Sequence, residues 1–366
     1  MGVIEIYKLA PRAAFHFGLR GVGVEATESF CPADTLFSAL CLTLRQWESE
    51  KKLEDWLEGF PPLNGGAPPP LRLSSALPYA GEVLFFPKPM APANLTEKKQ
   101  QSQAKSLKKI AFVSEGIFRA WLGHEELNQE LHPDNLLHGG KVWVTSAERP
   151  RLEDFRDDLT GKILMWDEQT LPRVAIDRIT SHSAVYQAGV LRFKAEAGLF
   201  VLVEFLGDAK AERDRLTTLL QVLGHNGLGG ERSSGYGQFE LQDPETFKDL
   251  APSKKNRFLT LSPYHPTWSE VEAGVLGSGA AYELQTRRGW VGSLEGMNLR
   301  RRAVRVLGEG SILQHAGVAP QPSYGDLADV TPRDEKGREV LGHKIWRYGI
   351  AFPVPVSVPL EREEEN

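Results

Sequence analysis

Two segments with helical periodicity, each lying between strand-like segments, constrain the fold of this 366-residue chain most strongly. In 35–49 and in 208–223 the apolar residues recur at intervals of three and four, as on one face of an α-helix. Asp34 is the predicted N-cap of the first helix, and Gly224 and Gly227 follow the second, as glycines often do at helix ends. Short apolar segments around the two helices are predicted strands: 3–9, 71–78, 83–86, 199–205 and 238–241.

This order of elements is that of a ferredoxin-like domain, strand-helix-strand-strand-helix-strand. We therefore predict an α+β protein with two such domains. The first spans 1–243 and carries a long insertion at about 88–172 and a thumb hairpin at about 174–198. The second, 244–357, is strand-rich and is predicted to be a smaller, degraded copy, followed by a disordered acidic tail, 358–366.

Composition excludes several classes of protein. Forty-three Lys and Arg against forty-eight Asp and Glu give a net charge of −5, so any nucleic-acid-binding surface must be local. Two cysteines, Cys31 and Cys41, are too few for a disulfide framework or a four-cysteine zinc site. The chain has no run of 18 apolar residues that could span a bilayer. We expect a cytoplasmic protein with no membrane partner and no cofactor.

Two local basic clusters stand out from this acidic background. One holds five lysines and no acid: Lys98, Lys99, Lys105, Lys108 and Lys109. It is predicted to be either a mobile solvated loop or a contact to a phosphate backbone. The other sets six arginines against Glu295: Arg287, Arg288, Arg300, Arg301, Arg302 and Arg305. It is either a solvated strand or a surface for RNA or a partner protein.

The segment 227–237 carries the most chemical information, with five glycines and two serines in eleven residues. Glycine allows a backbone to approach a bulky anion closely, and successive amides in such a turn form an anion-binding concavity. Arg232 can add a charge-assisted hydrogen bond. Nucleotide-binding glycine loops of the common kinds are excluded, because the segment lacks Gly-Lys-Ser/Thr and follows a helix instead of opening one. The alternative is a tight helix-to-strand turn.

A family resemblance is carried by this loop and by segments spread over most of the chain. The loop resembles the glycine-rich loop of CRISPR-associated RAMP proteins, which are built from ferredoxin-like (RRM-type) domains. The ensemble is similar to the fourth Csm subunit of type III-A CRISPR effector complexes, a RAMP of the Cas-five group; the type III-B counterpart is its nearest neighbour. The other segments are Phe15–Gly18, Asp34–Ala39, Ser74–Tyr79, Phe86–Pro89, Asp177–Thr180, Gly310–Ser311 and Trp346–Gly349.

The resemblance implies a non-catalytic crRNA-binding subunit in antiviral defence. Such a subunit caps the foot of the Csm complex, holds the 5′ handle of the guide RNA and contacts the large polymerase-like subunit and the backbone RAMP subunit. It meets target RNA only indirectly. No catalytic residue, metal or cofactor is implied.

The predicted RNA-binding residues fall into three groups. The glycine loop supplies Gly227, Gly229, Gly230, Arg232, Ser233, Ser234, Gly235 and Tyr236. The thumb supplies Arg178, Ser181, His182, Ser183 and Tyr186. Loops expected to face the same groove supply His16, Arg20, Ser29 and Lys88. If the loop only contacts RNA, bulky residues at Gly229 and Gly230 should abolish RNA binding while leaving unfolding nearly unchanged.

Two other functions remain open. A metal-independent RAMP endoribonuclease that matures guide RNA would use a histidine as general acid or base, from His16, His182, His225 or His265. No His/Cys cluster has zinc spacing, and Ser233 and Ser234 lack the Gly-x-Ser-x-Gly frame of a nucleophile elbow. The third possibility is a scaffold whose main contacts are with proteins.

Overall fold

The computed structural model of the chain describes residues 3–18, 25–176, 183–248, 250, 257–292, 299–315 and 323–357. Four predicted site residues lie outside these ranges: Arg20, Arg178, Ser181 and His182. The predicted acidic tail lies outside them as well.

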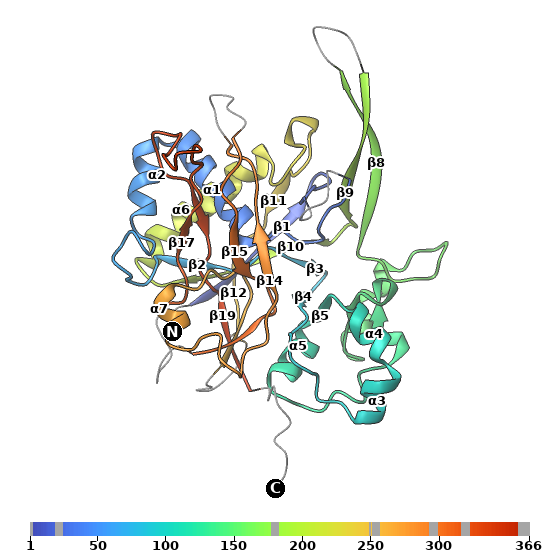
Figure 1. Ribbon diagram of the computed structural model, residues 1–366. Coiled ribbons are helices and arrows are strands. Elements are labelled where there is room, and N and C mark those ends of the chain that lie inside the picture. The colour runs from blue at the N-terminus through green and yellow to red at the C-terminus, as the bar shows by residue number, and fades with distance from the viewer. Residues whose placement is uncertain are drawn as a thin grey trace.

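A ten-stranded mixed sheet forms the centre of the molecule (Figure 1). Its main path is β11 (Phe239–Leu241), β1 (Ile4–Pro11), β10 (Ala197–Phe205), β3 (Leu77–Ala80), β4 (Val83–Pro87), β5 (Phe112–Ser114), β7 (Val142–Trp143) and β6 (Leu136–Leu137). Two further strands join it, β2 (Leu71–Leu73) on β10 and β12 (Glu245–Thr246) on β1. Only the β5–β7 pair is parallel among the pairings of this sheet. A mixed sheet whose strands are mostly antiparallel, together with helices in the same chain, confirms the predicted α+β class.

Two long helices, α1 (Ala33–Trp47) and α6 (Ala209–Asn226), pack against each other, and α6 also contacts β10 and β11. Leu36, Phe37 and Leu40 of α1 are buried, as the helical periodicity predicts. Asp208 caps α6 by accepting hydrogen bonds from the amides of Lys210 and Ala211. The prediction for Asp34 is wrong: Pro32 occupies the N-cap position, and Asp34 lies in the first turn with its side chain buried in ion pairs.

The insertion extends one edge of the sheet and carries short helices. These are α3 (Glu97–Ser102), α4 (Ala104–Lys109), α5 (Glu115–Leu122), and the 3-10 turns Pro133–Asn135, His138–Gly140 and Arg149–Phe155. The lysine-rich segment therefore forms α3 and α4 and is not a loop. Lys99 Nζ donates to the carbonyl oxygens of Asn128 and Leu131, so one of its five lysines serves the internal structure.

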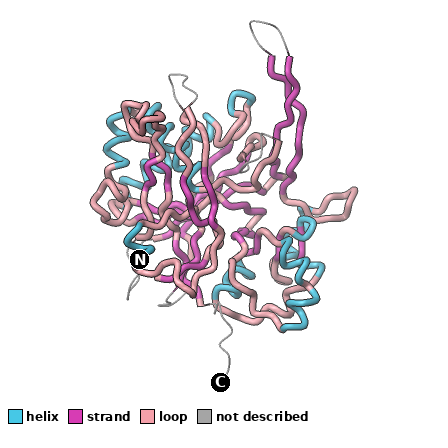
Figure 2. The backbone as a smooth tube through the Cα atoms, in the orientation of Figure 1, coloured by secondary structure: helices cyan, strands magenta, loops and turns pink. Residues whose placement is uncertain are grey.

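The thumb is a long two-stranded hairpin that projects from the body (Figures 1 and 2). Its strands are β8 (Trp166–Ile176) and β9 (Ser183–Phe193), so the stem begins earlier than 174. A β-bridge joins Leu191 at its base to Phe15.

The C-terminal part forms small sheets on the same core. β13 (Arg257–Thr260) lies between β16 (Ile312–Gln314) and β19 (Pro353–Val356). Two pairs complete it, β14 (Leu284–Arg287) with β15 (Val304–Leu307), and β17 (Leu327–Asp329) with β18 (Trp346–Tyr348). Its described residues include one short helix, α7 (Trp268–Glu272). The ring of Tyr348 lies 4.9 Å from that of Phe37 in α1, which joins this part to the N-terminal core.

One more helix, α2 (Glu50–Leu57), follows α1. None of the helices in the described ranges combines the length and the apolar character needed to cross a bilayer.

Candidate nucleic-acid interface

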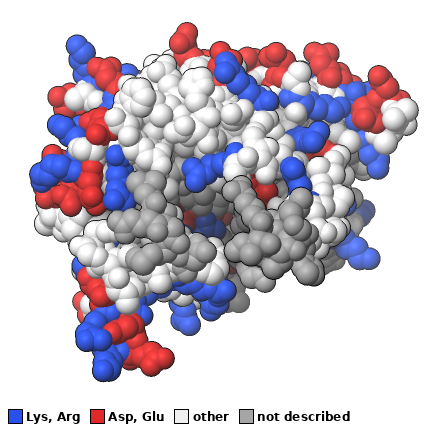
Figure 3. Space-filling model, turned by 90° about the horizontal axis from the view of Figure 1, so that it is seen from above, with Lys and Arg blue, Asp and Glu red and all other residues white. Residues whose placement is uncertain are grey.

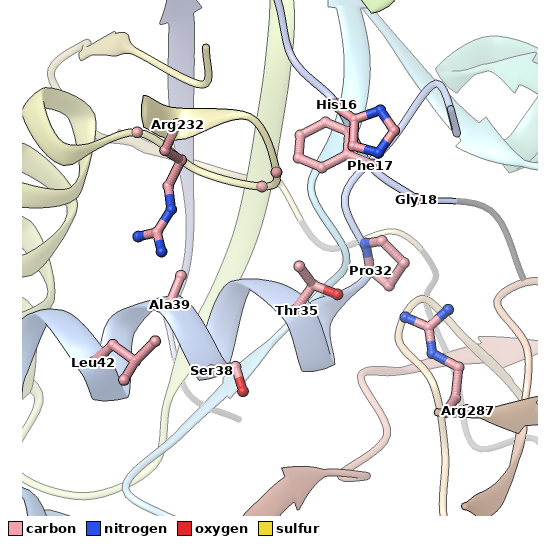
Figure 4. Close-up of a pocket in the computed structure, with 13 residues that line it drawn as sticks. His16, Phe17, Gly18, Pro32, Thr35, Ser38, Ala39, Leu42, Arg232 and Arg287 are labelled. Carbon is pink, nitrogen blue, oxygen red and sulfur yellow. The ribbon is translucent and has the colours of Figure 1, made fainter. Parts of the chain in front are cut away.

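A groove of about 200 Å³ lies between the glycine loop, residues 16–18 and the first turns of α1 (Figure 4). We call it the α1 groove. Its floor is Thr35, Ser38, Ala39 and Leu42 of α1. Its walls are Gly227, Gly229, Gly230 and Arg232 of the loop, His16, Phe17 and Gly18 opposite α1, and Pro32 and Arg287 at one end. The figure shows Arg232 and Arg287 on opposite sides of the hollow, with the hydroxyls of Thr35 and Ser38 between them.

The glycines of the loop allow a close backbone approach to residues 14–17. The Gly230 amide donates to the His16 carbonyl at 2.9 Å, and the Gly237 amide donates to the Ala14 carbonyl at 2.8 Å. At Gly229, φ is +97° and an added Cβ would lie 2.5 Å from the His16 carbonyl oxygen. The expectation that bulky residues at Gly229 and Gly230 would spare stability is therefore wrong, because they would displace this wall of the groove.

The loop uses part of its amides internally and leaves others available. Ser234 N–H and Gly235 N–H donate to the carbonyls of Glu231 and Arg232. Four other amides in the loop have no acceptor among the described residues: those of Gly229, Glu231, Arg232 and Ser233. Neighbouring free amides of this kind suit an anion such as a phosphate.

The two arginines of the groove differ in their exposure and in their ion pairs. Arg232 is exposed and forms no ion pair with an acidic residue of the described ranges. Arg287 is buried and donates to Asp34 through Nε at 3.0 Å and Nη2 at 2.5 Å, and Arg347 also bonds to Asp34. Burial alone would raise the pKa of Asp34, but the two guanidinium groups outweigh it and hold that pKa well below its usual range. The single carboxylate of Asp34 thus holds two buried guanidinium groups, Arg287 and Arg347. Arg232 is the exposed arginine in the lining of the groove.

Tyr236 does not present a free ring. It is 8% exposed, the Arg173 guanidinium lies 4.8 Å from the ring centroid, and Arg173 also donates to its hydroxyl. On the neighbouring strand β9, directly opposite Arg173, Tyr186 donates its hydroxyl to Glu231 Oε2 at 3.3 Å. These contacts tie the thumb to the glycine loop, so Tyr236 and Tyr186 position the loop and the hairpin relative to each other.

The remaining predicted residues lie in different surroundings. Ser233, Ser234 and Gly235 are exposed beside the groove, and Ser183 is exposed on the thumb. His16 lines the groove but is 6% exposed, with Nδ1 2.8 Å from the Gly189 carbonyl oxygen, so we assign its proton to Nδ1. The half-buried Ser29 does not line the groove. Neither does Lys88, whose Nζ donates to the Leu107 carbonyl at 2.9 Å and whose pKa burial lowers.

Sequence reasoning missed two polar groove residues, Thr35 and Ser38. Both fall on the half-buried side of the first helix, next to its core face. It also missed the partners of Asp34, because Arg287 and Arg347 are about 250 and 310 residues away in the sequence. Ser38 Oγ also accepts from Arg301 Nη1 at 3.0 Å, which brings the second basic cluster to the edge of α1.

Two other candidate histidines, His265 and His225, do not line the α1 groove. The His265 Nδ1 lies 2.7 Å from Asp326 Oδ1, and His225 is exposed at the end of α6. The described residues hold no group of three or more His, Cys, Asp or Glu side chains arranged to bind a metal ion.

Comparison with known proteins places this chain in a family. Residues 253–356 match the CRISPR Csm4 C-terminal domain. The chain is 30% identical over 347 residues to the CRISPR system Cms protein Csm4 of Mycobacterium tuberculosis, with 94% of each chain covered. The chain belongs to the Csm4 family. This confirms the resemblance to the fourth Csm subunit.

Other relatives agree with the Csm4 assignment. The Csm4 protein of Thermococcus onnurineus is 26% identical and covers 89% of this chain and 92% of its own. The fold is similar to a chain in the crystal structure of the Csm3-Csm4 subcomplex of the type III-A CRISPR-Cas interference complex. The TM-score is 0.66 at 16% identity, covering 97% of this chain and 100% of that one. A chain of the Csm1-Csm4 cassette in complex with pppApA gives a TM-score of 0.57 at 18% identity.

Proposed function

We propose that this Csm4 protein is the subunit of a type III-A CRISPR (Csm) effector complex that holds the 5′ handle of the crRNA, without catalysing a reaction. The observation that carries the proposal is the α1 groove. It combines in one hollow the hydroxyls of Thr35 and Ser38, the exposed Arg232, and loop amides that have no acceptor among the described residues. Its ligand is therefore a flexible polyanion with polar edges, which describes single-stranded RNA.

The fold supports this proposal by placing the groove on a rigid frame. We interpret β1, α1, β3, β10, α6 and β11 as a ferredoxin-like (RRM-type) unit, with the glycine loop between α6 and β11. One wall is held by the hydrogen bond from Gly230 to His16 and the floor by the buried face of α1. A groove built in this way presents its donors in fixed positions, which lowers the entropic cost of binding.

We also propose the partners of the complex. Solved structures similar in fold include a Csm3-Csm4 subcomplex and a Csm1-Csm4 cassette. The corresponding partners of this chain would be the backbone RAMP subunit and the large polymerase-like subunit. Target RNA would be met only through the guide.

The test is reconstitution of the complex with two guide RNAs that differ only in the 5′ handle. We expect the chain to bind and incorporate the handle-bearing guide more tightly than the handle-less guide. Equal incorporation would contradict handle recognition.

In parallel, the purified chain is incubated with repeat-containing RNA. Site-specific cleavage that is lost on changing one histidine would support the endoribonuclease alternative.

A further inference from the structure

We propose that Trp290, with Arg300 against its ring, is a stacking platform for one unpaired nucleobase of the bound RNA. The inference rests on the proposed function, since it names a second subsite for the same RNA. The platform lies outside the glycine loop, on the extension of the hairpin formed by β14 and β15. Trp290 and Arg300 face each other there across an antiparallel β-bridge.

The geometry of this subsite is open on one side. The Arg300 guanidinium carbon lies 4.8 Å from the centroid of the Trp290 ring, while 56% of the Trp290 residue is exposed to solvent. The pair borders a hollow of about 380 Å³ lined by Arg288, Gly289, Trp290, Arg300, Arg301 and Ala303. An indole ring held against a guanidinium on the surface offers a flat partner of the kind on which single-stranded bases stack.

The described residues around the hollow carry positive charge. Arg288, Arg300 and Arg301 form no ion pair with an acidic residue in the part of the chain that the structure describes. Arg301 is half-buried, its Nε lacks a partner, and burial lowers its pKa, with Arg347 adding to the effect. Three such cations around one aromatic ring suit a nucleotide, whose phosphate and base would engage the arginines and the indole respectively.

The hollow continues the α1 groove. A third depression borders both, because it shares Ser38 and Leu42 with the α1 groove and Arg301 with the Trp290 hollow. The hydrogen bond from Arg301 to Ser38 links them directly. Seen from above, this side of the molecule has a central hollow with Lys or Arg atoms at its bottom and Asp or Glu atoms beside them (Figure 3). One RNA strand can therefore contact the glycine loop and Trp290 in succession.

This continuity favours RNA over a protein as the occupant. Three of the six lining residues are arginines, and none of the three pairs with an acidic residue in the described ranges, so the hollow suits the phosphates of an RNA strand. Trp268 makes a useful contrast: it is 75% exposed, but its indole N–H donates to Glu272 of its own helix and no described arginine lies over its ring.

The experiment combines a protein variant with base removal in the RNA. The probe is a synthetic guide RNA with the host repeat's 5′ handle, together with a series in which one nucleotide at a time is abasic. Affinities are measured by fluorescence anisotropy for the wild-type chain and for Trp290→Ala, Trp290→Phe and Trp268→Ala. Thermal unfolding of each variant serves as the folding control.

We expect one abasic position to raise Kd by roughly 5- to 100-fold with the wild type. With Trp290→Ala, the same abasic position should carry no further penalty; Trp290→Phe should keep part of it, and Trp268→Ala should match the wild type. Two results would contradict a stacking role for Trp290. One is a rise in Kd at the same abasic position that is as large in Trp290→Ala as in the wild type. The other is a wild-type Kd that no abasic position changes. Equal wild-type binding of handle-bearing and handle-less RNA would contradict the proposed function instead, and the Trp290 penalty would still decide the platform.

Discussion

The carbonyl oxygen of His16 accepts a hydrogen bond from the amide of Gly230, and these two residues lie in segments more than 200 positions apart. The bond fixes the glycine loop against the residues that follow β1. The α1 groove therefore exists only when both segments are in place, and the glycines of the loop serve packing as well as binding.

Gly229→Ala tests this packing role. A Cβ at this position would meet the His16 carbonyl at 2.5 Å, in a backbone with φ of +97°. Left-handed strain and overpacking together should lower the free energy of unfolding by about 2–4 kcal/mol. Urea denaturation measures this loss, and RNA affinity should fall with it.

Gly235→Ala is the matched control, because its φ is +83° but nothing lies within 4 Å of the added Cβ. Only the left-handed strain remains there, so the cost should be about 1–2 kcal/mol. Equal losses for the two variants would show that residues 14–17 do not press on the loop.

Arg232→Ala should weaken binding of handle-bearing RNA and reduce the slope of log K against log salt by roughly one phosphate contact. The reason is that Arg232 is exposed at the groove and has no acidic partner in the described ranges. Arg12→Ala provides the comparison, since Arg12 is exposed but paired with Glu240 at 2.9 Å. Identical salt slopes for wild type and Arg232→Ala would mean that Arg232 does not contact the RNA.

Asp34→Asn should destabilise the fold by about 3–5 kcal/mol, because it leaves Arg287 and Arg347 buried without their counter-charge. Asp55→Asn, which breaks an exposed pair with Lys51, should cost less than about 1 kcal/mol. Chemical denaturation of the two variants checks the difference. A small loss for Asp34→Asn would contradict a structural role for the buried pair.

The same carboxyl predicts an acid response. The pKa of Asp34 is depressed in the folded state, so its contribution to stability is fully present above the unfolded value of about 3.9. That contribution is lost as the pH falls below about 4 toward the lower folded-state pKa. Unfolding free energies measured between pH 6 and pH 2 should therefore fall further in the wild type than in Asp34→Asn. Parallel curves would rule out the depressed pKa.

Arg173→Ala combined with Tyr186→Phe should loosen the thumb relative to the glycine loop, because both contacts between the stem and the loop are removed. Amide hydrogen exchange in β8 and β9 near these residues should become faster, while exchange in β10 stays unchanged. Faster exchange throughout the sheet would instead indicate global destabilisation.

The sequence predicted the parts of this molecule that depend on local pattern. Helical periodicity located α1 and α6 to within about three residues, and the cluster of glycines located the loop that walls the groove. Both signals are short-range, since they arise from one helix face or from the backbone needs of a single turn.

The errors concern residues whose role is set by distant partners. Asp34 has the sequence pattern of an N-cap, yet Arg287 and Arg347 draw it into the interior. Tyr236 is one of the predicted RNA-binding residues of the loop, yet the Arg173 guanidinium from the thumb lies over its ring. Lys88 turns toward the insertion through the Leu107 carbonyl. No local pattern records which side chain another part of the chain will bring.

Photo-cross-linking of the assembled complex tests the central claim most directly. A guide RNA with a photoreactive nucleotide at each handle position is irradiated, and the cross-linked peptides are identified by mass spectrometry. The account predicts cross-links to peptides from the glycine loop, residues 227–237, and from the first turns of α1. Handle cross-links confined to other parts of the chain or to other subunits would contradict it.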